Sequence, residues 1–358
     1  PAAAADKTEW SFYGSARVAT FSYDDEAETA AVGLAPNGVN GFDDRDTIWI
    51  QQGNSRFGAN ASAGAVTGRV ELRETGEWRV IWGEWNFGFG KLGVGKNYTP
   101  SNMFYSNQVA YGEVNLLNTG GFYTGADGMI RLSFDNIADM FNFDIAFVEP
   151  AQLQAFGAGE DVPVLAGLGG SDLDTTLPQI EARLLFNWGP VQLETGIAWL
   201  EVEDTVIVGN AEREYDIDAW VAHLGIKFAM GPFYANASVY SGENNSYLGQ
   251  FLFDAVTPVY DAGTDSVVDA DGWGWLALAG FKLNDMISFE AGYGEAEDEP
   301  GLIGAFENQV SAYYLQAVLS PAPGVLIIPE VGERDYDSTG NVDEGDSFYF
   351  GAVWKISF

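Results

Sequence analysis

The sequence predicts an all-β protein, a 16-stranded antiparallel transmembrane β-barrel. Apolar and polar residues alternate in about sixteen segments of roughly ten residues, the length of a tilted membrane-spanning strand. Charged residues keep to one face of these segments, and the connections between segments alternate between short and long. No stretch shows a 3.6-residue period of helical length, so helices are not expected to cover the strands.

The composition agrees with many strands joined by tight turns. Of 358 residues, 14% are aromatic and 44 are glycine, whereas only 13 are proline. The formal charge of −36 argues against a nucleic-acid partner, because phosphate binding needs a basic surface. The chain has no cysteine, which excludes disulfides and any cysteine-based metal or redox site.

The alternation begins with the first segment. In residues 10–18 the even positions, from Trp10 to Val18, are apolar or small, and the odd positions carry Ser, Tyr and Arg. A strand places such alternate side chains on opposite faces. The same two-faced pattern recurs in residues 68–74, 128–135, 141–149, 179–188, 191–200, 219–230, 233–240, 286–295, 311–320 and 348–358.

Closure into a barrel explains why so many two-faced strands need no other layer. A soluble sandwich also alternates, but its apolar face must be covered by a second sheet. A barrel that turns its apolar face to lipid has no edge and satisfies every backbone hydrogen bond. Tryptophans toward the segment ends fit the aromatic girdles at the two membrane interfaces, namely Trp10, Trp188, Trp199, Trp220, Trp273 and Trp354.

The connections predict two different rims. Short turns are expected near Gly64 and at residues 88–91, 136–140, 189–190, 231–232, 284–285 and 321–324. Longer, acidic and glycine-rich loops are expected near residues 24–45, 98–127, 149–178, 201–216, 241–271, 295–308 and 333–346, with one brief exception around Thr75. Short turns on one side and long loops on the other are typical of outer-membrane barrels.

These features together resemble a sixteen-stranded, general-type bacterial porin over nearly the whole chain, with porins of sulfate-reducing bacteria as the nearest subgroup. The segments that carry the resemblance are "FYGSARVATFSY" from Phe12, "NSRFGANA" from Asn54, "FGFGKLGVGKNYTP" from Phe87 and the final "FYFGAVWKISF". The resemblance implies one porin domain over residues 1–358 and an inward-folded third loop at about 98–127. It also implies a homotrimer, passive diffusion of small polar solutes and ions through a water-filled channel, no enzymatic activity and no bound cofactor.

The resemblance also assigns a basic wall at the pore constriction. Arg17, Arg56, Lys96 and Arg131 match positions where the family places its cationic cluster, and the alternation adds Arg69 and Arg73. The acidic motif usual in the third loop is missing, and among residues 98–125 only Glu113 offers a carboxylate. Further inward-facing acids are expected on later strands, roughly opposite the basic wall, namely Asp144, Glu181, Glu194 and Glu290. The missing acidic motif of the third loop departs from the family pattern, and it leaves the ion selectivity open.

Two other functions remain open at this stage. A substrate-selective outer-membrane channel for small organic anions or sugars would need a row of arginines or aromatic side chains along the lumen, and the arginines are partly present. A soluble acidic β-protein would dissolve without detergent. A hydrolase is not expected, because the single histidine, His223, has no marked nucleophile and fits a solvated lumen position.

The acidic clusters of the long loops could bind calcium or bridge lipopolysaccharide phosphates through divalent ions, although ordinary solvated loops explain them as well. These clusters are residues 24–28, 268–272, 295–299 and 342–346. Small outward residues such as Gly14, Ala16 and Ala59 predict that strands one to three, beside strand sixteen, form the trimer contact.

The two ends of the chain agree with an exported barrel of a Gram-negative outer membrane. The alanine run near residue 1 fits the cleavage site of a removed signal peptide, or a floppy tail. Phe358 is expected on the lipid-facing side of the closing strand, at the periplasmic rim. The resemblance implies that this terminal aromatic is also an assembly signal for the barrel-assembly machinery.

Overall fold

A computed structural model describes residues 7–26, 44–110, 115–150, 171–208, 211–250, 258–261, 263–301, 308–336 and 345–358. Its first strands are β1 (Glu9–Glu26), β2 (Asp44–Gln51), β3 (Arg56–Ala63), β4 (Val66–Arg73), β5 (Trp78–Asn86), β6 (Lys91–Tyr98), β7 (Ala126–Ile137), β8 (Phe141–Val148), β9 (Ser171–Asp174) and β10 (Gln179–Trp188). Then follow β11 (Val191–Val208), β12 (Ala211–Met230), β13 (Phe233–Glu243), the short helix η1 (Asn245–Leu248), β14 (Val259–Asp261), β15 (Ser266–Val268), β16 (Ala270–Lys282), β17 (Ile287–Pro300), β18 (Asn308–Ala322), β19 (Val325–Tyr336) and β20 (Asp346–Ser357).

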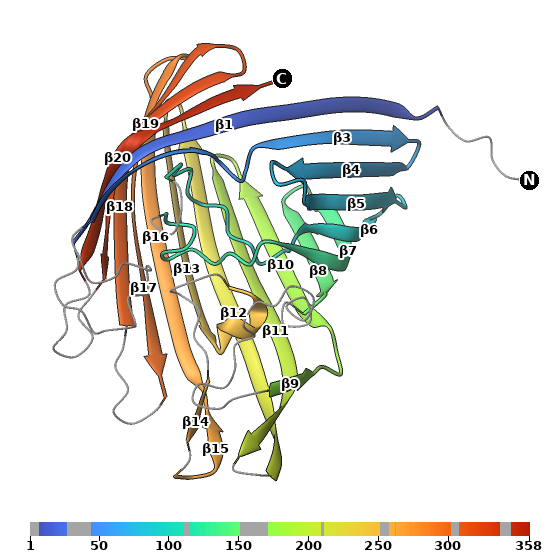
Figure 1. Ribbon diagram of the computed structural model, residues 1–358. Coiled ribbons are helices and arrows are strands. Elements are labelled where there is room, and N and C mark those ends of the chain that lie inside the picture. The colour runs from blue at the N-terminus through green and yellow to red at the C-terminus, as the bar shows by residue number, and fades with distance from the viewer. Residues whose placement is uncertain are drawn as a thin grey trace, which may run out of the picture.

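The strands form a closed antiparallel barrel (Figure 1). Most strands pair with their neighbours in sequence, while β8 pairs with β10, β13 pairs with β16, and β14 and β15 form a separate hairpin. Twelve residue pairs join β1 to β20, from Ser15 opposite Ser357 to Glu26 opposite Asp346. Both β2 and β3 pair with β1, and both β9 and β10 pair with β11, so each of these two pairs forms one interrupted strand. The 18 strands of the sheet therefore make 16 positions around the barrel, which confirms the predicted fold class.

The side chains alternate between the two faces of the wall as the sequence predicts. On β20, Phe350, Trp354 and Ile356 are exposed on the outer face, whereas Tyr349 and Val353 are buried on the inner face. The outer face is mainly apolar, as expected for a surface that would face lipid, and the inner face carries most of the charged residues. In the described part of the chain, no helix is long and apolar enough to cross a membrane.

The predicted short turns are confirmed, but one predicted loop is wrong. Residues 201–208 belong to β11 and residues 211–216 to β12; these strands are 18 and 20 residues long and pair from Val191 opposite Phe228 to Val208 opposite Ala211. The acidic composition suggested a loop, yet alternation continues there, with Val202 and Ile217 buried on the inner face. The wall is uneven as a result, since β3, β4, β6 and β8 have only eight residues each (Figure 1).

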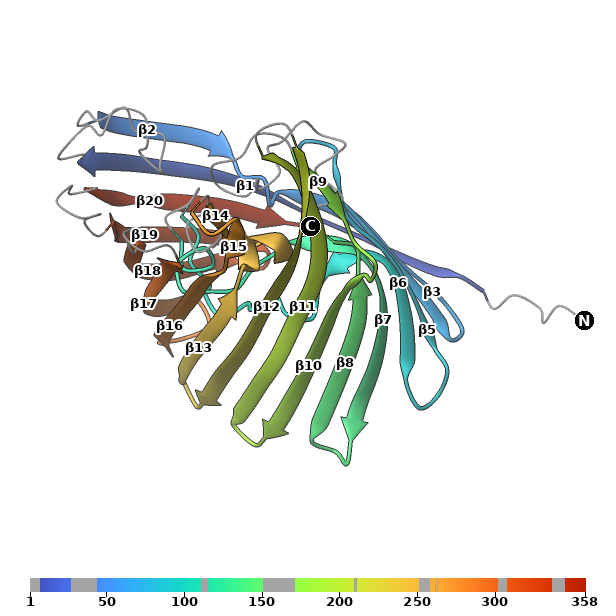
Figure 2. The same cartoon turned by 90° about the horizontal axis from the view of Figure 1, so that it is seen from below.

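The connection between β6 and β7, residues 99–125, is here called L3, and the structure describes its residues 99–110 and 115–125. L3 lies inside the ring of strands (Figure 2), which confirms the predicted inward-folded third loop. Its Met103, Tyr105 and Phe122 are buried in one apolar cluster with side chains of the barrel wall. Glycines make room for this contact, because a Cβ at Gly225 would lie only 2.2 Å from the Tyr105 hydroxyl.

The final residue is held by the first strand. Gly14 donates its N–H to the Phe358 carbonyl at 2.8 Å, and Phe358 donates its own N–H to the Gly14 carbonyl at 3.0 Å. The Phe358 ring covers Gly14, since a Cβ there would lie 2.7 Å from the ring. The Phe358 side chain is exposed on the outer face, as predicted.

This contact predicts a size limit at position 14. Gly14→Leu is expected to displace the Phe358 ring and to lower the temperature at which the folded barrel converts to the unfolded band on a gel. Ala16→Leu, on the same face of β1, is the matched control and should change this temperature less. If Gly14→Leu combined with Phe358→Ala were no more stable than Gly14→Leu alone, the steric explanation would be wrong.

Candidate functional site

Buried carboxylates hold L3 against the barrel wall. Glu181 of β10 accepts hydrogen bonds from the Ser101 N–H at 2.8 Å, the Ser101 hydroxyl at 2.7 Å and the Gln179 side-chain amide at 2.7 Å. On β11, Glu194 accepts a hydrogen bond from the Tyr105 hydroxyl at 3.3 Å. The first half of L3 is therefore anchored to two neighbouring strands.

Glu290 of β17 anchors the next part of the loop. It accepts hydrogen bonds from the Asn107 side-chain amide and the Tyr234 hydroxyl at 2.7 Å each, and from the Gln316 side-chain amide at 3.0 Å. The Tyr314 hydroxyl donates a further hydrogen bond to Glu290. These donors satisfy the buried carboxyl group of Glu290, so it fixes the position of this part of the loop.

The sequence analysis missed the last anchor, Glu330 of β19. It accepts hydrogen bonds from the backbone N–H groups of Val109 at 2.8 Å and Ala110 at 3.1 Å, and from the Tyr349 hydroxyl at 2.8 Å. On the other side, the Gln52 side-chain amide donates to the Val109 carbonyl at 2.9 Å. The alternation of residues 325–336 could have shown that Glu330 faces inward.

These contacts change the role expected for three acids. Glu181, Glu194 and Glu290 do face inward, but all three are buried beneath L3. They were expected to line the lumen opposite the basic wall, whereas the structure uses them to fasten the loop. Alternation gives the face of a residue and does not show what covers it.

The densest cluster of cations surrounds a single carboxylate, Glu71 of β4. Its fully buried side chain receives hydrogen bonds from Arg69 at 2.8 Å, Arg79 at 2.7 Å and the Tyr13 hydroxyl at 2.7 Å. An Arg56 nitrogen lies 3.6 Å from the same carboxylate. Four neighbouring strands, β1, β3, β4 and β5, thus contribute to one inner surface.

Further cations extend this surface along the wall. The ladder register places Arg73 opposite Arg56 and Arg17 opposite Lys355. Arg17 lies within electrostatic range of Arg56 and Glu71. We call this set the arginine cluster, and it consists of Arg17, Arg56, Arg69, Arg73, Arg79 and Lys355 around Glu71.

Arg79 was missed because the strand is irregular there. The register shifts between Glu71 and Leu72, which pair with Val80 and Trp78 and leave Arg79 as the extra residue of a β-bulge. A bulge allows two successive side chains to point to one face. The inward direction of Arg79 therefore could not be read from simple alternation.

Two residues assigned to the basic wall lie outside the arginine cluster. Lys96 pairs with Ile81, whose side chain is exposed on the outer face, so the register assigns Lys96 to that face. The register favours the outer face for Lys96, and its family-based assignment to the lumen stays a prediction. Arg131 faces inward farther along the wall, with its guanidinium 4.8 Å from the Trp82 ring centre.

A second, smaller group of charges involves Asp144. Its carboxylate accepts hydrogen bonds from Arg183 at 2.6 Å and from the Ser133 hydroxyl at 2.5 Å. Asp144 is inward-facing as predicted, but it is paired with Arg183, which the sequence analysis did not single out. Glu113 lies outside the described residues.

L3 presents aromatic side chains beside the arginine cluster. The ring of Tyr98, the last residue of β6, lies 4.9 Å from the Phe104 ring of L3 between ring centres. The rings of Phe104 and Tyr123 lie 5.8 Å apart. The Arg79 guanidinium lies 4.9 Å from the Tyr98 ring centre and donates a hydrogen bond to the Tyr98 hydroxyl. The narrowed lumen therefore has cations on the wall and aromatic rings on the loop.

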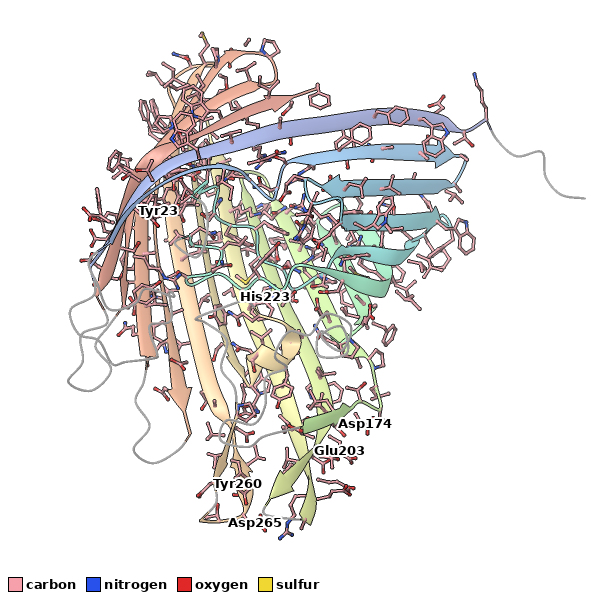
Figure 3. All side chains as sticks on the ribbon, viewed as in Figure 1. Tyr23, Asp174, Glu203, His223, Tyr260 and Asp265 are labelled. Carbon is pink, nitrogen blue, oxygen red and sulfur yellow. The ribbon has the colours of Figure 1, made fainter. Side chains whose placement is uncertain are left out.

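His223 is not the solvated lumen residue that the sequence suggested. It points inward from the middle of β12 (Figure 3), but its side chain is fully buried, and its Nε2 lies 3.6 Å from a Glu194 oxygen. Its backbone carbonyl accepts a hydrogen bond from Thr195 at 3.0 Å. These contacts place His223 among the groups that pack beneath L3.

The long-loop rim carries a separate polar cluster around Asp265, at the tip of the β14–β15 hairpin (Figure 3). Asp265 accepts hydrogen bonds from the hydroxyls of Tyr260 at 2.9 Å and Tyr215 at 3.1 Å, and these bonds lower its pKa. Within the described ranges, no group of three or more His, Asp or Glu residues could hold a metal ion. The calcium hypothesis stays a prediction, since residues 24–28 and 342–346 lie partly outside those ranges.

The lowered pKa of Asp265 predicts a pH-dependent hairpin. The ionised carboxylate stabilises the contact above the unfolded pKa of about 3.9, and this contribution is lost as the pH falls through the lower folded-state pKa. Asp265→Asn should therefore speed amide hydrogen exchange in residues 259–268 at pH 7, after correction for the intrinsic rate. Asp285→Asn, on the opposite rim, is the control; equal rates for wild type and Asp265→Asn at pH 7 would contradict the prediction.

The barrel is similar to solved outer-membrane channels. The outer membrane channel DcaP of Acinetobacter baumannii has a TM-score of 0.71 at 14% identity, covering 98% of this chain and 97% of that chain. The anion-selective porin from Comamonas acidovorans has a TM-score of 0.62 at 11% identity, covering 98% and 100%. OmpT of Vibrio cholerae has a TM-score of 0.60 at 16% identity, covering 99% of both chains. No family model and no curated protein matches the sequence, and the structural likeness shows the porin fold.

Proposed function

We propose that this protein is a porin of a Gram-negative outer membrane, through which small polar solutes and ions diffuse passively. The proposal rests on a closed barrel whose lumen is narrowed by L3 next to the arginine cluster. A homotrimer is part of the proposal, supported by a trimer form of OmpT of Vibrio cholerae among the similar structures. Lipids, lipopolysaccharide and the barrel-assembly machinery are the partners that this location implies.

The trimer contact is proposed at β1, β3 and β20. The outer rings of Phe12 and Phe57 stack there at 6.4 Å and are exposed, as expected for a surface that a neighbouring subunit covers. Gly14 was assigned to this contact because it is small, but the Phe358 ring of the same subunit covers it. The aromatic side chains therefore take over the role first assigned to that glycine.

We further propose that the channel prefers anions. The arginine cluster has six cations and one carboxylate, Glu71, which three of the cations contact, whereas Glu181, Glu194 and Glu290 are buried beneath L3. Unbalanced positive charge beside a low-dielectric wall raises the local anion concentration. The acidic outer loops oppose this effect, but their exposed charges are screened at 1 M salt, where the Debye length is about 3 Å.

The test is the reversal potential of single channels in a planar bilayer under a KCl gradient. We expect conductance steps in triplets and a reversal potential of the sign given by chloride-favouring channels, persisting at 1 M salt. A cation-favouring sign at 1 M salt would overturn the anion preference. A protein that stayed soluble without detergent and formed no channels would overturn the porin proposal itself.

A further inference from the structure

Phe104 points away from the wall to which L3 is fastened. Its neighbours in sequence, Met103 and Tyr105, are buried against the barrel, whereas 44% of the Phe104 surface is exposed. Hydrogen bonds on either side, from Ser101 to Glu181 and from Asn236 to the Tyr105 carbonyl, fix this direction of the chain. A partly exposed apolar ring is thus held inside the barrel, near the arginine cluster.

The Phe104 ring is also held in place by its own neighbours. It meets Tyr98 at an interplanar angle of 86° and Tyr123 at 70°, both edge-to-face arrangements. Arg79 binds Glu71 and the Tyr98 hydroxyl, and so connects the aromatic group to the arginine cluster. The exposed ring is therefore part of a preorganised surface and not a loosely placed side chain.

Cations lie next to this aromatic surface. Tyr123 lies within electrostatic range of Arg79, Arg73 and Arg56. The Arg56 side chain is partly exposed and lies 3.6 Å from Glu71, in looser contact with that carboxylate than Arg69 and Arg79. The exposed surface of Phe104 thus lies near guanidinium groups of the arginine cluster. Such a surface complements a ligand that has both a ring and a carboxylate.

We propose that this surface binds small aromatic monocarboxylates, with the ring on Phe104 and the carboxylate toward Arg56 and Arg73. The proposal rests on the anion-preferring channel and names its substrate class. Guanidinium groups bind carboxylates through paired, charge-assisted hydrogen bonds. Aromatic rings add edge-to-face or offset-stacked contacts that a saturated ring makes less well.

The experiment measures transient block of the single-channel KCl current by benzoate, the probe for the proposed class. Cyclohexanecarboxylate has the same charge and a similar size without the aromatic ring, and benzyl alcohol has the ring without the charge. We expect the wild type to be blocked by benzoate at about threefold to tenfold lower concentration than by cyclohexanecarboxylate, which corresponds to one aromatic contact. Benzyl alcohol should block least.

Phe104→Leu keeps apolar volume and removes the ring, so it should abolish the difference between benzoate and cyclohexanecarboxylate. Phe147→Leu, an exposed phenylalanine of the outer face on β8, is the matched control and should keep that difference. Equal block by the two acids in wild type would overturn the aromatic site while leaving the anion preference intact. A wild-type channel without chloride preference would, in contrast, overturn the proposed anion preference on which this site rests, so the two failures are distinguishable.

Discussion

Arg56→Gln combined with Arg73→Gln is expected to remove most of the anion preference. The two residues are paired across β3 and β4, and the change leaves Glu71 bound to Arg69 and Arg79. Two positive charges then disappear from the inner surface without breaking the closest ion pairs. We expect the reversal potential to move to zero or to the cation-favouring side, with the conductance in 1 M KCl changed less than twofold because the barrel and L3 are intact.

Lys96→Gln is the matched control for this experiment. It removes one positive charge, against two in the arginine variant, from the same part of the barrel, but the register favours the outer face for Lys96, beside Ile81. The reversal potential of Lys96→Gln should therefore equal that of the wild type. If Lys96→Gln moved the potential as far as the arginine variant, the location of the selective charges would be wrong. If the arginine variant had no effect, the arginine cluster would not control selectivity.

Glu290→Gln combined with Glu330→Gln is expected to release L3 from the wall. Each carboxylate accepts at least three hydrogen bonds, and a bond to a charged group contributes about 1.5–3 kcal/mol. In each glutamine, the single amide oxygen can accept only some of these hydrogen bonds. The NH₂ group cannot accept any, so it would face donors that are left without a partner. The open channel should become noisier, with larger and more variable conductance steps, while the trimer band on a gel persists.

Glu333→Gln is the control for the released loop. Glu333 lies on the same strand as Glu330, but it pairs with Tyr313 on the outer face. The Tyr313 hydroxyl donates a hydrogen bond to Glu333 at 3.0 Å. Steady wild-type conductance is expected for this variant. Steady conductance in the Glu290→Gln, Glu330→Gln variant as well would show that apolar packing alone holds L3.

Alternation predicted the barrel and the face of most strand residues, because the pleat of a strand links sequence parity directly to direction. It failed where the ladder is irregular, as at Arg79, which occupies a bulge. It also could not show that L3 covers Glu181, because the path of a loop depends on contacts with strands far away in sequence. For Lys96 the two arguments differ, since the family position indicates the lumen whereas the pairing with Ile81 favours the outer face.

The contacts of the L3 tip have a consequence for the order of folding. Val109 contacts Glu330 on β19 and also Gln52, which lies between β2 and β3, on the other side of the junction of β1 with β20. Gln108 contacts Tyr349, which is 241 residues away in sequence. Loop-closure entropy makes such distant contacts form late. The tip can find all of its partners only after the last strand has joined the first. We therefore expect the tip of L3 to dock as a late step of folding, after β1 and β20 have paired.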